Sequence, residues 1–320
     1  MAHPFLSLMK PFIVQRGALL RGLLFLAVFR TTSAWAQPID FPDPGSDPGA
    51  TSGPPPIAVQ AVYSTTGSGP AEFRGRDRGD SGASTYSIRL QGAVPLRPPT
   101  WMMPLGLSAQ NVEFDALPAA AVPDAAHVLS LNTGVGFRMN EEWMFMARLS
   151  PTLYRTSGIS SGDVGISGGL IALWRRSPSL TLMMGLLANP DGEFPVLPAL
   201  GAQWTISPEL TLSLMVPRPQ IIYRPNERWS FHAGASLDGV TFRTSDTFGN
   251  ERNEPRYNHA LASYRDLRVG SGFEVRIKPK ISLQVEGGYS VDRRLDYTRI
   301  DERVKFDPAP YFQAGLQLTF

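Results

Sequence analysis

The chain has 320 residues, enough for one large all-β domain or two ordinary domains, and its 30 glycines and 29 prolines suit a protein with many turns. It contains no cysteine, which excludes disulfides, thiolate metal sites and cysteine nucleophiles. Four of its 30 basic residues and none of its 28 acidic residues lie before residue 37, which leaves 26 basic against 28 acidic residues. The two signs are mixed along the chain, so no nucleic-acid-binding surface is indicated.

The first 36 residues have the pattern of a secretory signal peptide. Basic residues between positions 10 and 21 precede the apolar run 22–29, and small residues at 34 and 36 offer a cleavage site before Gln37. The apolar run is too short to span a bilayer. We therefore expect residues 1–36 to direct export and to be removed.

Residues 37–56 form a tract rich in proline, glycine and aspartate that can neither pair as a strand nor bury a core. We expect a periplasmic leader in this tract. A plug threaded into the following domain is the alternative.

From residue 57 onward, apolar and polar side chains alternate in segments separated by turn residues, as in half-buried strands. In 281–291, for example, Ile281, Leu283 and Val285 would share one face, and Ser282, Gln284 and Glu286 the other. The pattern predicts fourteen strands, with twelve as the alternative, at 57–66, 84–95, 101–114, 127–139, 143–155, 164–175, 179–188, 196–206, 210–217, 219–224, 229–244, 259–277, 281–297 and 310–320. A change of apolar phase at Asp238–Gly239 predicts a β-bulge.

The links between these strands alternate in length. Short links are expected near 96–100, 140–142, 176–178, 207–209, 225–228 and 278–280, and long ones at 67–83, 115–126, 156–163, 189–195, 245–258 and 298–309; the short link at 217–219 is an exception. Short turns at one rim and long loops at the other are typical of transmembrane β-barrels. Because no run of about 18 apolar residues exists, membrane insertion would require a closed sheet.

Aromatic residues collect near the strand ends. All five tryptophans after residue 36, Trp101, Trp143, Trp174, Trp204 and Trp229, fall beside short turns, and tyrosines such as Tyr63, Tyr154 and Tyr297 fall toward the opposite ends. Amphipathic rings prefer the depth of lipid headgroups, so we expect these eight residues at two membrane interfaces. A soluble β-sandwich gives no reason to collect its tryptophans at one end.

The last ten residues alternate apolar and polar side chains and stop on Phe320. This strand resembles the insertion signal of Gram-negative outer-membrane β-barrels. The resemblance implies that residues 57–320 form one all-β, antiparallel transmembrane barrel with short periplasmic turns and long extracellular loops. It also implies that the barrel-assembly machinery reads Phe312, Leu316, Leu318 and Phe320, and that outer-membrane lipid and lipopolysaccharide surround the protein.

Two further stretches, 214–223 and 287–294, resemble a group of uncharacterised bacterial barrel proteins known as domains of unknown function. This second likeness brings no substrate with it.

Polar residues on the inward phase of the expected strands are candidates for the lumen. They are Arg89, Gln91, Arg138, Arg148, Gln203, His232, Arg268, Glu274, Arg276, Gln284 and Glu286. Such a wall predicts a passive pore or transporter for small polar solutes, with arginines that favour anions. The alternative is a closed structural or surface-interaction barrel braced by pairs among Glu274, Arg276 and Glu286.

A lipid hydrolase is a minor alternative. His232 shares its phase with Ser230 and Ser236, and His259 precedes Ser263, but residues two or four apart on one strand lie roughly 7 or 13 Å apart. The histidines are too scattered for a metal site, and no cofactor motif is present. We therefore expect no enzyme activity, no metal and no cofactor.

Overall fold

The computed structural model describes residues 57–320 except 116, 118–119, 157–162 and 193–194. The expected signal peptide and leader lie outside this range. The strands are β1 (Ala58–Phe73), β2 (Arg76–Arg97), β3 (Trp101–Phe114), β4 (Ala125–Arg138), β5 (Trp143–Arg155), β6 (Val164–Ser177), β7 (Leu180–Ala188), β8 (Val196–Thr205), β9 (Leu210–Ser213), β10 (Gln220–Tyr223), β11 (Trp229–Arg243), β12 (Leu261–Lys278), β13 (Ile281–Tyr297), β14 (Glu302–Phe306) and β15 (Ala309–Thr319). Three 3-10 turns, η2 (Asn250–Arg252), η3 (Pro255–Tyr257) and η4 (Thr298–Ile300), lie in the links.

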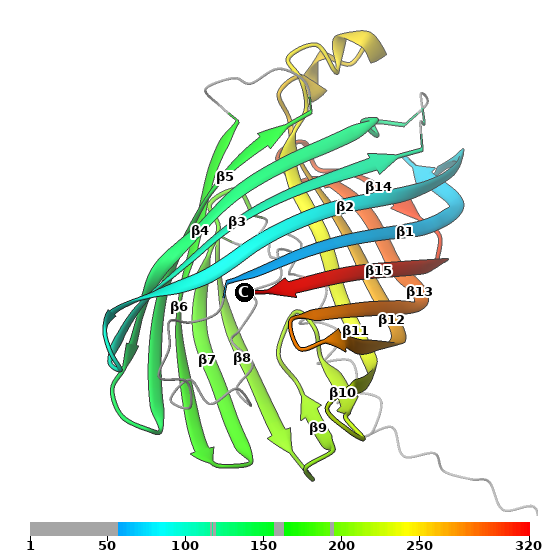
Figure 1. Ribbon diagram of the computed structural model, residues 1–320. Helices are drawn as coiled ribbons and strands as arrows, with labels where there is room; N and C mark the ends of the chain where they lie inside the picture. Colours follow the sequence, from blue (N-terminus) through cyan, green and yellow to red (C-terminus); the bar gives the residue numbers. More distant parts are fainter. Residues whose placement is uncertain (1–56, 116, 118–119, 157–162, 193–194) are drawn as a thin grey trace, which may run out of the picture. The chain divides into compact units, whose positions relative to one another are not determined.

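The strands form one closed antiparallel sheet, as predicted. From β1 to β14 each strand pairs with the next in the chain, β15 pairs with β13, and β1 pairs with β15, so the first strand (blue) lies beside the last (red) in Figure 1. β14 and β15 both lie between β13 and β1, so they are two parts of one strand. The barrel therefore has fourteen strands around its circumference, the larger of the two predicted numbers.

The two faces of the sheet differ in polarity. Leu90, Leu107 and Leu131 are paired across three strands, and each is more than 40% exposed. On the opposite face, the hydroxyls of Ser130 and Thr152 lie 3.0 Å apart and are buried. The outer surface is thus apolar where a soluble protein would be polar. No helix in the described part of the chain is long and apolar enough to cross a membrane.

The prediction of a long loop at 67–83 is wrong. β1 continues to Phe73 and β2 begins at Arg76, and Arg74 and Gly75 make the turn with φ of 54° and 69°. The Gly- and Asp-rich sequence has low strand propensity, but register shifts after Thr66 and Pro70 keep it paired with β2. Similarly, β14 lies within the expected loop at 298–309.

β9 and β10 are shorter than expected and interrupt the wall. Each has four residues, and the link 214–219 makes only a few further backbone hydrogen bonds, to Ala202 of β8 and from Ala235 and Leu237 of β11. Among the described residues, the facing edges of β8 before Ala202 and of β11 after Leu237 have no partner strand. Pro198, which has no N–H to donate, lies on this edge of β8.

Candidate functional site

A network of charged and hydroxyl side chains crosses the inside of the barrel. Arg268 on β12 is 5% exposed and donates from Nε to Asp266 Oδ2 at 2.8 Å. Its Nη1 donates to Ser64 Oγ at 2.8 Å and its Nη2 to Thr66 Oγ1 at 3.1 Å, both on β1. Because β13 and β15 separate β12 from β1, these contacts span the concave face of the sheet. A buried guanidinium is stable here because carboxylate and hydroxyl oxygens replace its water.

Glu286 on β13 is the centre of a neighbouring cluster and is 6% exposed. Its Oε2 lies 3.0 Å from His232 Nε2 and 3.9 Å from Arg218 Nη2, and its Oε1 accepts a 2.6 Å hydrogen bond from Tyr311. The guanidinium of Arg268 lies 4.9 Å from the centre of the Tyr311 ring, which connects the two clusters. The inner wall around β11–β15 and β1 is therefore polar, and the charges of Arg268 and Glu286 on it are paired.

The opposite part of the inner wall carries an apolar cluster. Side chains from β5–β8 and from the link after β9 pack together and are buried: Met146, Ile171, Leu173, Met183, Ala199 and Met215. On the strands, these residues alternate with exposed outer residues such as Phe145, Leu170 and Leu200. The interior therefore contains a methionine-rich cluster opposite the polar network, which period-two alternation alone did not predict.

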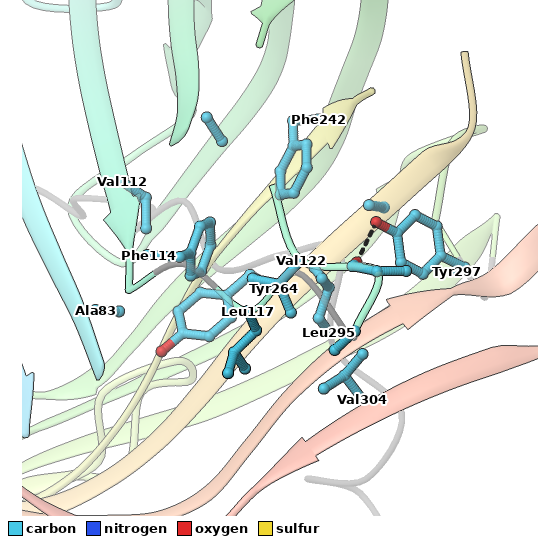
Figure 2. Packing of buried hydrophobic residues seen from close by; sticks show 14 of the residues in the cluster. Ala83, Val112, Phe114, Leu117, Val122, Phe242, Tyr264, Leu295, Tyr297 and Val304 are labelled. Atoms are coloured by element: carbon cyan, nitrogen blue, oxygen red, sulfur yellow. Dashed lines mark hydrogen bonds between the residues drawn. The ribbon is translucent and has the colours of Figure 1, made fainter. Parts of the chain in front are cut away.

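The long-loop end of the barrel is filled by an apolar group that we term the mouth cluster. Figure 2 labels ten of its residues, Ala83, Val112, Phe114, Leu117, Val122, Phe242, Tyr264, Leu295, Tyr297 and Val304; Ala121, Tyr154 and Val240 also belong to it. Leu117 and Val122 come from the link between β3 and β4, whereas Tyr264 and Leu295 come from β12 and β13. The Tyr297 hydroxyl donates a 2.6 Å hydrogen bond to the carbonyl of Ala121. The β3–β4 link is thus held against strands on another part of the wall.

At the surface of the same end of the barrel, four charged residues contact one another in a group that we term the rim latch: Arg74, Glu254, Arg256 and Glu302. Arg74, in the β1–β2 turn, donates to Glu254 Oε1 at 2.9 Å and to Glu302 Oε1 at 3.0 Å. Arg256 donates to Glu254 Oε2 at 2.8 Å and to Glu302 Oε1 at 2.6 Å. The hydrogen bond from Arg74 is the main cause that keeps the pKa of Glu254 below its ordinary value, and the same bond raises the pKa of Arg74. The latch connects the β11–β12 link to the β1–β2 turn.

The predicted lumen residues have different surroundings. His232, Arg268 and Glu286 come together in the clusters above. Arg89, Gln91, Arg138, Arg148, Gln203 and Gln284 are partly buried and lie on the phase opposite exposed apolar neighbours. Glu274 and Arg276 are exposed near the β12–β13 turn, and the bracing contacts of Glu286 come from His232, Arg218 and Tyr311 instead. A role of these residues in solute passage stays a prediction.

The predicted position at the membrane interface is wrong for two tyrosines. Tyr297 is 0% exposed and Tyr154 is 6% exposed, both within the mouth cluster, whereas Tyr63 is 38% exposed. For Tyr297 the cause is a bulge: Leu267 pairs with Asp292 and Arg268 with Ser290, so Val291 is unpaired and the phase after it is inverted. Tyr154 shares its phase with the buried Thr152.

The bulge predicted at Asp238–Gly239 is wrong. β11 pairs with β12 without a register shift from Trp229 to Arg243. The apolar phase changes there because Val240 and Phe242 face the mouth cluster inside the barrel. An apolar interior at one end thus imitates a bulge in the sequence pattern.

The tryptophans lie beside the short turns, and the final strand has an exposed apolar face, as predicted. Trp101, Trp143 and Trp229 are the first residues of β3, β5 and β11, and Trp174 and Trp204 lie near the ends of β6 and β8, all at the short-turn end. On β15 and just after it, Phe312, Leu316 and Phe320 are 47%, 41% and 66% exposed, and Leu318 is partly buried. Their roles at the interface and in assembly stay predictions.

The residues considered for a hydrolase have other partners. Ser236 donates to Asp238 at 3.1 Å, and the hydroxyl of Ser263 lies 3.0 Å from that of Thr241. His232 contacts Glu286, and His259 Nδ1 lies 3.2 Å from Asp246. Among the described residues, none of the three histidine–serine pairs considered, His232 with Ser230 or Ser236 and His259 with Ser263, is in hydrogen-bond contact. Within the described ranges, no group of three potential metal ligands is found.

Sequence reasoning missed Asp266, Tyr311 and Arg218. Asp266 shares the phase of Arg268 two residues away, which is a usable signal for an inward ion pair. Tyr311 lies on the phase opposite Phe312, so its alternation already places it inside. Arg218 lies in an irregular link, and nothing in the local pattern indicates that it reaches Glu286.

Comparison with known proteins identifies a family. A search of curated proteins found no match. Among solved structures, an outer membrane channel from Pseudomonas putida F1 is similar, with a TM-score of 0.46 and 12% identity over 86% of this chain and 99% of that one. A FadL homologue of Pseudomonas aeruginosa (TM-score 0.43, 11% identity, 83% and 90% coverage) and the P. putida toluene transporter TodX (0.38, 11%, 86% and 92%) are also similar. The family model described as "Domain of unknown function (DUF6268)" matches residues 83–319, and the chain belongs to this family.

Proposed function

We propose that this chain is a bacterial outer-membrane channel, held closed here by the mouth cluster and the rim latch. The observation that carries the proposal is the closed fourteen-stranded sheet with its apolar side chains exposed outside and polar side chains paired inside. Only a closed sheet or a helix can satisfy its backbone groups in lipid. Its short turns would face the periplasm.

The size of the barrel favours a channel over a filled scaffold. Side chains just fill the interior of barrels with about eight strands, and fourteen enclose more space. The polar inner wall with Arg268, Glu286 and His232 suits small polar solutes. The mouth cluster closes one end, so passage requires the β3–β4 link to move.

Residues 1–36 would direct export, and residues 37–56 would form a periplasmic leader. The barrel-assembly machinery would read the strand that ends at Phe320, and lipopolysaccharide would surround the long-loop rim.

The experiment is electrophoresis of boiled and unboiled protein, followed by conductance in planar bilayers. We expect a heat-modifiable barrel with rare openings, and more frequent openings in Val122→Asp, because Val122 is 1% exposed and a carboxylate cannot remain in the mouth cluster. A protein that stays monodisperse without detergent and shows no heat shift would contradict the membrane assignment.

A closed structural or surface-interaction barrel is the second candidate, favoured by the packed mouth cluster and the buried network around Arg268. A heat-modifiable protein that carries no current, even as Val122→Asp, would select this candidate over the channel.

A further inference from the structure

The outer face of β3–β7 contains an apolar trough with a volume of about 530 Å³. Ala147 and Ala172 are the small outward residues among larger neighbours: Phe145 pairs with Ala172, and Ala147 pairs with Leu170. The bulky outward side chains that line the trough are Trp101, Val135, Phe137, Phe145, Leu170, Met184 and Leu186. The trough is therefore a gap two alanines wide among large outward side chains.

Two stacked tryptophans lie between this trough and the short-turn rim. Trp143 and Trp174 are paired across β5 and β6, with ring centres 5.4 Å apart and planes 7° apart. They are two residue pairs closer to the rim than Phe145 and Ala172. Indole rings prefer headgroup depth, so the trough would begin just below the headgroups.

A positively charged side chain, Arg176, lies at the same end of the trough as the two tryptophans. The guanidinium of the exposed Arg176 lies 5.6 Å from the Trp174 ring centre, which holds the charge beside the tryptophan pair. The indole N–H of Trp174 has no hydrogen-bond partner among the described residues. The opposing charges nearby are Glu141 and Glu142 in the β4–β5 turn, both exposed.

We propose that this surface is a binding site for one phospholipid, with an acyl chain in the trough and the phosphate at Arg176. The inference rests on the proposed membrane location. The trough is lined by apolar side chains and lies on the face that meets lipid, so an acyl chain fits its chemistry, and a phosphate is a ready partner for a guanidinium. The alignment of a cation, an indole pair and an apolar trough along β5 and β6 matches the order of groups in one lipid.

The test is native mass spectrometry of the full-length mature barrel, released from detergent with added phosphatidylglycerol or phosphatidylethanolamine. We expect one retained phosphatidylglycerol, and loss of this lipid in Ala147→Phe or Ala172→Phe, because a phenyl ring fills the trough. Arg176→Gln should weaken phosphatidylglycerol retention by about threefold, as for an exposed ion pair, and reduce the preference over phosphatidylethanolamine.

Matched controls are present in the chain. Ala233 is an exposed alanine on β11, and Arg228 is an exposed arginine directly before Trp229 at the same rim. Ala233→Phe and Arg228→Gln should retain lipid as the wild type does. Equal retention in Ala147→Phe, Ala172→Phe and Ala233→Phe would overturn the site and indicate a general lipid layer only. Each variant is first tested for heat-modifiable mobility and conductance, so loss of the barrel is distinguished from loss of the lipid site.

Discussion

The hydroxyl of Tyr297 on β13 donates a 2.6 Å hydrogen bond to the carbonyl oxygen of Ala121, in the link between β3 and β4. The two residues are 176 positions apart, and neither is more than 3% exposed. This bond attaches an irregular link to a strand on another part of the wall. In the proposed channel, this bond would hold the link in place across the mouth cluster.

Replacing Tyr297 with Phe removes this bond and leaves the Ala121 carbonyl without its donor. We expect a loss of about 1 kcal/mol in unfolding free energy and more frequent channel openings in planar bilayers. Tyr63→Phe on the exposed outer face is the control. Identical opening frequencies in the two variants would show that the link does not govern closure.

The rim latch should weaken in acid. The pKa of Glu254 is lowered in the folded state, so its contribution is complete above the ordinary carboxyl pKa of 4.5 and disappears as the pH falls through the lowered folded value. We expect channel openings to increase at acidic pH, and Glu254→Gln to show frequent openings already at neutral pH. Conductance recorded as a function of pH measures both, with Glu227→Gln as the exposed control. A pH profile unchanged by Glu254→Gln would rule out this group as the acid-sensitive element.

Replacing Arg268 with Met leaves Asp266, which is 0% exposed, without its cation. We expect a loss of about 3 kcal/mol in unfolding free energy, seen as a lower temperature for the electrophoretic shift. The double variant Arg268→Met with Asp266→Leu should recover part of this loss, because no unpaired charge remains. Arg276→Gln, at an exposed position of the same strand, should change stability by less than about 0.5 kcal/mol. Equal effects of Arg268→Met and Arg276→Gln would be incompatible with a buried network.

Replacing Phe320 with Ser tests the predicted assembly signal. Phe320 is 66% exposed, and its N–H is bonded to the carbonyl of Ile57, so the side chain contributes little to the folded core. We expect less heat-modifiable protein in the outer membrane of cells but an unchanged refolding yield in detergent. A loss of yield in detergent as well would place the effect in folding rather than in recognition.

Alternation along the strands was sufficient to predict most of their positions, because each strand meets an apolar and a polar side over most of its length. The transmembrane barrel was predicted from the lengths of the links, the placement of the aromatic residues and the resemblance of the final strand as well. It was insufficient at the mouth, where both faces of β11–β13 are buried and Val240, Phe242 and Leu295 face inward. The unpaired Val291 inverts the phase of Tyr297. Four of the five residues between them are charged, so the alternation of apolar and polar side chains does not reveal this change of phase. The Glu286 cluster joins residues from four separate segments, and Arg218 reaches it only because β9 and β10 are short.

That shortness has a mechanical consequence. Between the link at 214–219 and the long-loop end, no ladder hydrogen bond joins β8 to β11 among the described residues. These parts of the two strands can therefore move apart or together without breaking one. All other neighbouring strands would have to lose paired backbone groups for the same displacement. The circumference at the long-loop end is therefore adjustable at one position, and a widening of the barrel would begin between these two strands.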